Sequence, residues 1–208
     1  MKIKKPKIIN CREYNIKDAY LENEFTNYIF NENSDSEIII SDVTIDSCIF
    51  KNINFNNIEI NNVDLVDVIF ENCDLSNKKF DYKFIERVEF RNCKMMGMTF
   101  ISSSIKDTLI DNSMCKYINF TEAKINNIII NNSDLSEMTF IETKIKNVDF
   151  DDVNFSESEI SNTNLNGIDF STCNISNLMI DFVSLKGIII DKFQSFDLIH
   201  MLGVKFKE

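Results

Sequence analysis

Residues 45–70 read IDSCIFKNINFNNIEINNVDLVDVIF, and a large apolar residue recurs at every fifth position: Ile45, Phe50, Phe55, Ile60, Leu65 and Phe70. The same frame runs from Ile40 to Ile190, and all 31 of its positions are apolar. Because hydrophobic residues make up 44% of the chain, chance would give this pattern with a probability of about 10⁻¹¹. The five-residue period is therefore the feature that decides the fold.

A second apolar register lies two residues before each of these centres. It runs from Ile38 to Ile188, and 29 of its 31 positions are apolar or small; the exceptions are Lys78 and Lys83. Each unit of five therefore has two inward residues and three outward ones. Because a buried unpaired lysine is costly, we predict a local bulge that turns both lysines outward.

A period of five fits neither a helix, with 3.6 residues per turn, nor a flat strand, in which side chains alternate. A chain that turns by about ninety degrees every five residues keeps every centre inside. Four such turns close a square coil of about 20 residues, and successive coils stack like strands. We therefore predict an all-β quadrilateral β-helix in which Phe50, Phe70 and Phe90 form a column.

The position two residues after each centre is where the corner is expected. Asparagine and glycine tolerate the positive φ of tight turns. Twelve asparagines and three of the four glycines of the chain occupy this position: Asn52, Asn57, Asn62, Asn72, Asn77, Asn92, Asn112, Asn127, Asn132, Asn147, Asn162, Asn177, Gly97, Gly167 and Gly187.

Several units resemble one known repeat family. Cys73-Asp-Leu-Ser-Asn, Ser133-Asp-Leu-Ser-Glu and Ala123-Lys-Ile-Asn-Asn are similar to the pentapeptide repeat, whose pattern is A(D/N)LXX. This resemblance covers about residues 38–190 and implies a right-handed β-helix, a pentapeptide-repeat solenoid. The chain departs from the pattern by often placing Ile, Met or Leu at the first inward position, where the family favours small residues.

The two ends depart from the frame, and they suggest three parts. Residues 1–37 keep it only at Tyr20, Phe25 and Phe30, so we predict a capping coil with a polar loop at residues 31–37, where Asp35 stands in place of a centre. Residues 38–190 form the repeat. Residues 191–208 are expected to hold a short helix, starting at Asp191 with Gln194 as its partner in a capping box and stopping near Gly203, and then a strand at Val204–Phe206.

The C-terminal end carries a second resemblance. Gly167-Ile-Asp-Phe-Ser-Thr-Cys-Asn174, Leu185-Lys-Gly-Ile-Ile-Ile-Asp-Lys-Phe-Gln194 and Leu202-Gly-Val204, together with Phe70-Glu-Asn-Cys-Asp-Leu-Ser76, are similar to Qnr-type quinolone-resistance proteins. The resemblance implies a homodimer joined end to end and binding to DNA gyrase or topoisomerase IV as a DNA mimic. The dimer interface is expected on one apolar stripe of the helix: Phe193, Phe196, Ile199 and Leu202. The polar loop at residues 31–37 looks like the first of two loops in that group. The second loop is not visible here, because the frame is unbroken from Phe100 to Phe120.

The charges are segregated between two neighbouring faces of the predicted coil. The chain has 33 acidic and 22 basic residues, a formal net charge of −11, which argues against a free nucleic-acid binder. The predicted acidic, partner-binding face carries Glu71, Glu89, Asp111, Asp149, Asp151, Asp152, Asp169 and Asp191, with Lys51 and Arg91. The next face carries Arg87, Lys106, Lys124, Lys144, Lys146 and Lys186. The acidic face is either an ordinary solvated surface or a strip that mimics DNA. Asn52, Asn72, Asn92, Asn112 and Asn132 should form a ladder of bonded amides along it.

The sequence offers little catalytic chemistry. The only histidine, His200, lies in the predicted helix, and the six cysteines include no CxxC pair, so neither a metal site nor a cofactor is expected. No long apolar segment or signal peptide is seen, and free thiols fit a reducing cytoplasm; Cys73 and Cys93 should stack as buried thiols. We therefore predict a non-enzymatic binding protein. The alternative is a structural scaffold that uses the same rod for another protein partner.

Overall fold

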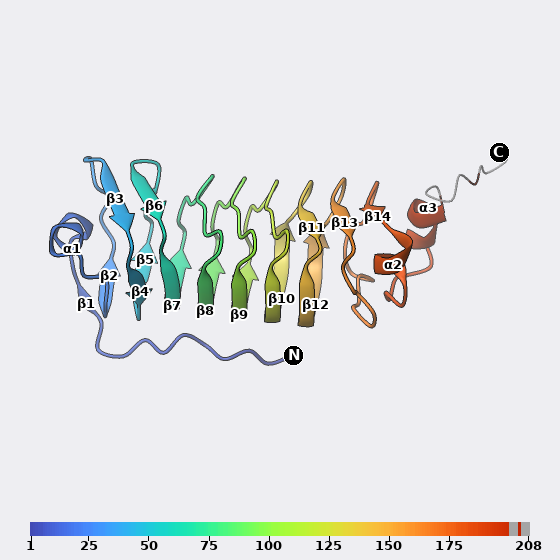
Figure 1. Cartoon of the computed structure of the whole chain (residues 1–208), viewed down its shortest axis with the longest axis horizontal. Helices are drawn as coiled ribbons and strands as arrows, with labels where there is room; N and C mark the ends of the chain where they lie inside the picture. Colours follow the sequence, from blue (N-terminus) through green and yellow to red (C-terminus); the bar gives the residue numbers. More distant parts are fainter. Residues whose placement is uncertain (200–203, 205–208) are drawn as a thin grey trace.

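The centres of the five-residue frame point into a closed interior in the computed structural model of the chain, which describes residues 1–199 and Val204. Phe50, Phe70 and Phe90 are buried and stack with ring centroids 5.0 and 5.2 Å apart and rings within 12° of parallel. Figure 1 shows the resulting rod, with α1 at one end and α3 at the other. It is a right-handed quadrilateral β-helix of about 8 turns, as predicted.

The walls of the rod are parallel strands related by 20 residues, so that Phe50 pairs with Phe70 and Ile130 with Phe150. The largest sheet has nine strands, in the order β1-β2-β5-β7-β8-β9-β10-β12, with β4 paired to β7. The elements are β1 (Arg12–Glu13), α1 (Ile16–Glu22), β2 (Tyr28–Phe30), β3 (Ile38–Ser41), β4 (Thr44–Asp46), β5 (Ile49–Lys51), β6 (Ile58–Asn61), β7 (Asp64–Glu71), β8 (Phe84–Arg91), β9 (Ser104–Asp111), β10 (Lys124–Asp134), β11 (Thr139–Ile141), β12 (Lys144–Asn154), β13 (Glu159–Ser161), β14 (Met179–Ile180), α2 (Phe182–Leu185) and α3 (Gln194–Ile199).

The corners fall where the sequence predicts them. Eleven of the twelve corner asparagines and all three corner glycines have positive φ. Asn57 is the exception, although the turn around it is still closed by the Ile58 N–H, which donates to the carbonyl oxygen of Phe55 at 2.9 Å. Corner geometry also imposes positive φ on Tyr82 and Arg87, residues that rarely adopt it. The position in the frame therefore decides the backbone conformation more strongly than the residue type does.

The predicted bulge at Lys78 and Lys83 is wrong. Lys79 pairs with Thr99 and Leu65 with Ile85, so the 20-residue spacing is kept and no residue is inserted. Both lysines stay at the inward register position and are half-buried. Their long side chains resolve the conflict, since the ammonium of Lys83 donates to the side-chain oxygen of Asn62 at the surface. Burial lowers the pKa of Lys78, and the nearby Glu59 carboxylate only partly opposes this.

The N-terminal end is covered by a short helix that the frame does not indicate. Asn15 caps α1, accepting a hydrogen bond from the Lys17 N–H at 2.8 Å. The helix buries Ile16 and Ala19, whereas Tyr20, predicted as a centre of the frame, is exposed. Figure 1 places α1 over the open end of the first coil, and Ile16 and Ala19 join the buried apolar core.

The polar segment 31–37 has no regular structure, as predicted, but it is not an insertion. Ile29 pairs with Ile49 before it and Ile38 with Ile58 after it, so the segment replaces one side of a coil without adding length. The Asn33 side chain fixes it to the next coil by accepting from the Asn54 N–H at 2.6 Å.

At the C-terminal end, the frame breaks earlier than predicted. Asp181 caps α2, accepting from the Ser184 N–H at 2.7 Å, so Val183 is exposed instead of pointing inward. The predicted capping box of the last helix is confirmed, because Asp191 accepts from the Gln194 N–H and donates its own N–H to the Gln194 side chain. Leu202, His200, Gly203 and most of the predicted strand at 204–206 lie outside the described residues.

No described helix is long and apolar enough to cross a membrane.

Candidate partner-binding surface

The predicted acidic face lies on the second half of the long strands, and its first acidic residues are neutralised. Lys51 and Glu71 form an ion pair of 3.5 Å across adjacent coils. In β8 and β9, Arg91 lies opposite Asp111. Of the first three carboxylates, Glu71 and Glu89 are in ion pairs, whereas Asp111 is only opposite Arg91 in the strand register.

Glu89 does not face solvent as predicted. It is only 1% exposed, because it lies between Ile69 and Leu109 on the neighbouring strands and its carboxylate accepts a hydrogen bond from Arg91. The position was predicted to point outward and the side chain does lie on the outer surface, but neighbours cover it. Glu89 is therefore removed from the candidate surface.

The remaining carboxylates gather near the C-terminal end of the face. Asp149, Asp151, Asp152, Asp169 and Asp191 are exposed, and we call them the acidic patch. Three of them, Asp149, Asp151 and Asp169, line one shallow hollow of about 440 Å³. A hydrogen bond from Ser171 lowers the pKa of Asp169, which keeps this carboxylate charged. The ammonium group of Met1 lies 3.0 Å from Asp149.

Side-chain amides support the same face, as predicted, but in separate pairs. Asn72 donates to Asn52 at 3.2 Å, and Asn112 donates to Asn92 at 2.5 Å. The amides stack one coil apart and exchange hydrogen bonds with one another, which is a structural role.

The neighbouring basic face is partly neutralised as well. Arg87 contacts Asp67 and Glu86, and Lys106 contacts Glu86 at 2.9 Å. The hydrogen bond from Lys106 lowers the pKa of Glu86. Four lysines further along the face are exposed: Lys124, Lys144, Lys146 and Lys186. The free positive and free negative charges thus lie on adjoining sides of the same late coils.

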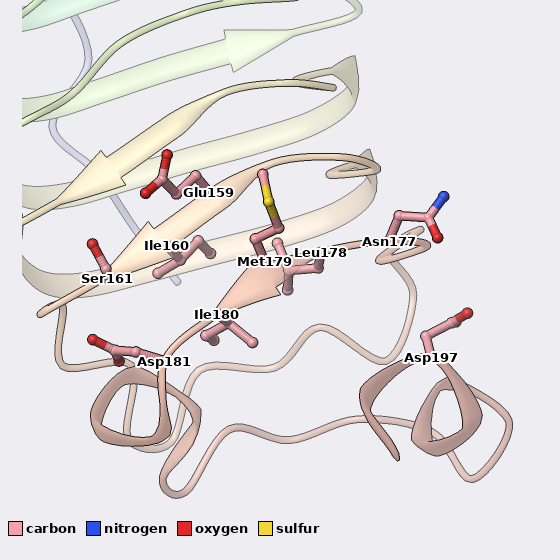
Figure 2. A pocket seen from close by; sticks show the side chains of 9 residues that line it. All are labelled: Glu159, Ile160, Ser161, Asn177, Leu178, Met179, Ile180, Asp181 and Asp197. Atoms are coloured by element: carbon pink, nitrogen blue, oxygen red, sulfur yellow. The ribbon is translucent and has the colours of Figure 1, made fainter. Parts of the chain in front are cut away.

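A depression near the C-terminal end of the rod is lined by three carboxylates (Figure 2). It measures about 540 Å³ and lies between β13, β14 and α3. Figure 2 shows its carboxylates, from Glu159, Asp181 and Asp197, spread around the hollow rather than aimed at one point. The Asp181 carboxylate already accepts backbone N–H groups from Asn162 and Ser184. These groups do not form a general acid and base poised over a common substrate position.

Metal-binding groups are not assembled in the part of the chain that the structure describes, where no three His, Cys, Asp or Glu side chains converge. All six cysteines are free thiols. Cys73 and Cys93 are buried one coil apart, as predicted. Burial also raises the pKa of Cys48 to about 12, so this thiol remains protonated.

Comparison with protein families agrees with this geometry. A model described as pentapeptide repeats (8 copies) matches residues 39–77, and one described as a pentapeptide repeat region matches residues 63–140. The chain belongs to the pentapeptide-repeat family.

Solved structures of other pentapeptide-repeat proteins also align with the chain. QnrB1, a plasmid-mediated fluoroquinolone resistance protein, is 20% identical over 99% of this chain and 94% of its own, with a TM-score of 0.44. HetL, involved in heterocyst differentiation regulation in the cyanobacterium Nostoc, is 11% identical over 85% of this chain and 96% of its own, with a TM-score of 0.32. No curated protein sequence matches the chain.

The C-terminal end of this pentapeptide-repeat protein presents apolar side chains. Of the predicted interface residues, Phe193 is 66% and Phe196 51% exposed, Ile199 is half-buried, and Leu202 lies outside the described residues. Phe182 and Val183 on α2 are about 70% exposed. Sequence reasoning missed these two because the five-residue frame assigned Val183 to the interior. Asp181 is a residue type that favours helix N-caps, and it could have indicated that a helix begins at Phe182.

Proposed function

We propose that this chain is an acidic binding protein that occupies the DNA-binding groove of a type II topoisomerase, DNA gyrase or topoisomerase IV. Bound there, it would mimic DNA and protect the enzyme from quinolones or from a peptide toxin. It would act in the cytoplasm, as a homodimer and without catalytic chemistry of its own. The observation that carries the proposal is the acidic patch.

The charge density of the patch supports a role as a DNA mimic. Its five carboxylates lie between Asp149 and Asp191, a separation of 42 residues, or about two coils. At ~4.8 Å per coil this is about 10 Å along the rod. Duplex DNA of that length carries about six phosphate charges, at one per ~1.7 Å. Asp149 is paired with the Met1 ammonium, so the four other carboxylates give the patch about two-thirds of the linear charge density of DNA.

The choice of partner rests on the sequence resemblance of the tail to Qnr-type proteins. Type II topoisomerases bind duplex DNA through basic grooves, and a rigid rod with a dense acidic side is complementary to such a groove.

The test is a supercoiling assay with purified gyrase, with and without a quinolone. The wild-type chain should inhibit supercoiling or protect the enzyme at micromolar concentration. The triple substitution Asp149→Lys, Asp151→Lys and Asp152→Lys should weaken the effect by at least about tenfold, because it replaces attraction by repulsion.

A matched control makes the same change in charge on other faces of the same coils. Glu142, Glu157 and Glu159 are exposed, and their replacement by lysine should leave the activity within about threefold of wild type. Absence of both inhibition and protection by the wild-type chain would refute the proposal. An equal loss in the two triple variants would show that only net charge matters.

The homodimer can be tested separately by sedimentation equilibrium. We expect Phe182→Glu with Phe193→Glu to shift the chain from dimer to monomer, because it places two charges in a dry apolar contact. Tyr82→Glu is the control, since Tyr82 is 72% exposed and lies in the middle of the rod. A wild-type chain that sediments as a monomer at 50 μM would count against the dimer.

A further inference from the structure

The N-terminal segment, residues 1–11, is bound along one corner of the rod. Figure 1 shows it leaving β1 and running back beside the coils as far as β10. We call this segment the strap. It holds four of the chain's lysines, Lys2, Lys4, Lys5 and Lys7, and it belongs to none of the coils.

The strap is fixed by hydrogen bonds to residues that stack on the same corner. Cys11 donates its thiol to the Ser47 carbonyl oxygen at 3.0 Å. The Lys7 N–H donates to Asp67 at 2.8 Å, and the Lys4 N–H donates to Asp107 at 3.1 Å. We call the surface beneath it, formed by Ser47, Asp67, Arg87, Asp107 and Asn127, the corner groove.

The spacing of the strap matches the spacing of the corner groove. Asp67 and Asp107 are 40 residues apart, or two coils, which corresponds to about 9.6 Å along the rod. Lys4 and Lys7 are three residues apart, and three residues of extended chain span about 10 Å. Every third backbone N–H of an extended peptide therefore meets a carboxylate on every second coil.

The corner groove also carries negative charge beneath the strap. Asp67 is 5% exposed and binds Arg87 through two hydrogen bonds of 2.6 and 2.8 Å. Burial would raise the pKa of Asp67, but the hydrogen bonds from Arg87 and from the Lys7 N–H outweigh it, and the pKa lies below its usual value. This carboxylate therefore stays ionised beneath the strap.

Asp107 shows that the strap does not satisfy the corner groove completely. Its side chain is 1% exposed, and Oδ1 accepts from the Lys4 N–H and from Asn127. Oδ2 is buried without a hydrogen-bond donor among the described residues. The Lys4 and Lys5 side chains extend into solvent. A buried carboxylate oxygen without a donor is costly, and a peptide that brought a donor to it would bind better than the strap does.

We propose that the corner groove is a binding site for an extended basic peptide segment of a partner protein, and that the strap is its exchangeable occupant. The strap covers the site until a segment with the same three-residue spacing of N–H donors, and with a donor for Asp107, displaces it. The Met1 ammonium at the end of the strap reaches Asp149 of the acidic patch, but the corner groove itself lies on the earlier coils, and its peptide binding is tested without topoisomerase.

The experiment compares two double variants of the full chain. Lys4→Pro with Lys7→Pro removes both N–H donors that reach the carboxylates. Lys2→Pro with Lys5→Pro is the matched control, because it removes the same number of lysines and likewise creates one Pro-Pro pair. Neither the Lys2 nor the Lys5 N–H makes a hydrogen bond within the described part of the structure.

The probe is a peptide with the sequence of residues 1–11, in which serine replaces the cysteine, carrying a fluorophore at its C-terminus. We expect it to bind the Lys4→Pro/Lys7→Pro chain at least about tenfold more tightly than the wild-type chain, in which the tethered strap competes at high effective concentration. The control variant should behave like the wild type. Hydrogen exchange at the Lys4 and Lys7 N–H groups should be slow in the wild type and in the control variant. It should be fast in the Lys4→Glu/Lys7→Glu chain, which keeps both N–H groups.

Three results would overturn the proposal. The first is equal binding of the peptide to all three chains, which would place it elsewhere on the surface. The second is failure of the peptide to bind a folded Lys4→Pro/Lys7→Pro chain at 1 mM. The third is equal binding of a scrambled peptide with the same composition. That result would show that net charge, and not the spacing of the N–H donors, accounts for the binding. If the proline variant does not fold, Lys4→Glu with Lys7→Glu should release the strap by repulsion and give the same result.

Discussion

Two ion pairs of the same spacing allow the effect of burial on this rod to be measured directly. Arg87 and Asp67 lie on adjacent coils, and so do Lys51 and Glu71. The first pair is bidentate, and its side chains are 13% and 7% exposed. The second has a single contact of 3.5 Å, and its side chains are 44% and 39% exposed. Double-mutant cycles to alanine on both pairs isolate the two coupling energies.

The expected coupling is about 2 kcal/mol for Arg87 with Asp67, since charge-assisted bidentate bonds in a desolvated site are the strong ones. For Lys51 with Glu71 it is below about 1 kcal/mol, because exposed pairs gain little over their hydration. Removing Asp67 alone should cost more than the coupling, since it leaves the Arg87 guanidinium partly buried beside Glu86 only.

The assay is urea unfolding followed by circular dichroism, repeated in 1 M NaCl. The Debye length there is about 3 Å, so the coupling of the exposed pair should vanish while most of the buried coupling remains. Equal m-values across the variants are the control for cooperative unfolding. Couplings that agree within 0.5 kcal/mol, or a buried coupling abolished by salt, would refute the argument that burial strengthens this pair.

Three further outcomes are expected. Phe70→Ala should destabilise the rod by about 3–5 kcal/mol in urea unfolding, whereas Phe84→Ala, at a side chain 64% exposed, should cost less than about 0.5 kcal/mol; similar losses would contradict the column of stacked rings. Gly187→Ala should lower the Tm further than Gly167→Ala, because both have positive φ but only at Gly187 would the added Cβ clash with the Asn166 side chain. Backbone N–H groups of Asn162 and Ser184 hold the pKa of Asp181 below its usual value, so its contribution to stability is present above the usual carboxyl pKa and is lost as the pH falls further; Asp181→Asn should flatten the pH dependence of stability below about pH 4.

The fold could be predicted because one geometric rule acts on every residue of the repeat. A centre such as Phe70 is apolar for the same reason as Phe50 and Phe90, so the signal accumulates along the chain. The corners follow from the same rule. At the two ends, the sequence does not repeat, so each conformation depends on a few residues. A single N-cap such as Asn15 or Asp181 decides there whether the chain forms a helix or continues the coil.

The candidate surface was less predictable, because exposure depends on neighbours that are distant in sequence. Glu89 occupies an outward position, yet Arg91 and two apolar neighbours cover it. Asp67 and Asp107 also occupy corner positions, and both are buried beneath the strap. The lysines of the strap are opposite in charge to the carboxylates of the corner groove, and this is visible in the sequence. The match between three residues of strap and two coils of groove can be recognised only when the rise per coil is known.

The position of the free charge bears on the proposed DNA mimicry. The formal charge of −11 spread along the whole rod gives a low average density, and the early carboxylates are paired with Lys51 and Arg91. The acidic patch lies in the last coils, next to the exposed Phe182 and Phe193. An end-to-end dimer formed there would bring two patches together at its centre, as one strip of about 20 Å with about two-thirds of the charge density of DNA. A DNA-binding groove would then meet the middle of the dimer, and loss of the dimer should weaken binding as much as loss of the carboxylates does.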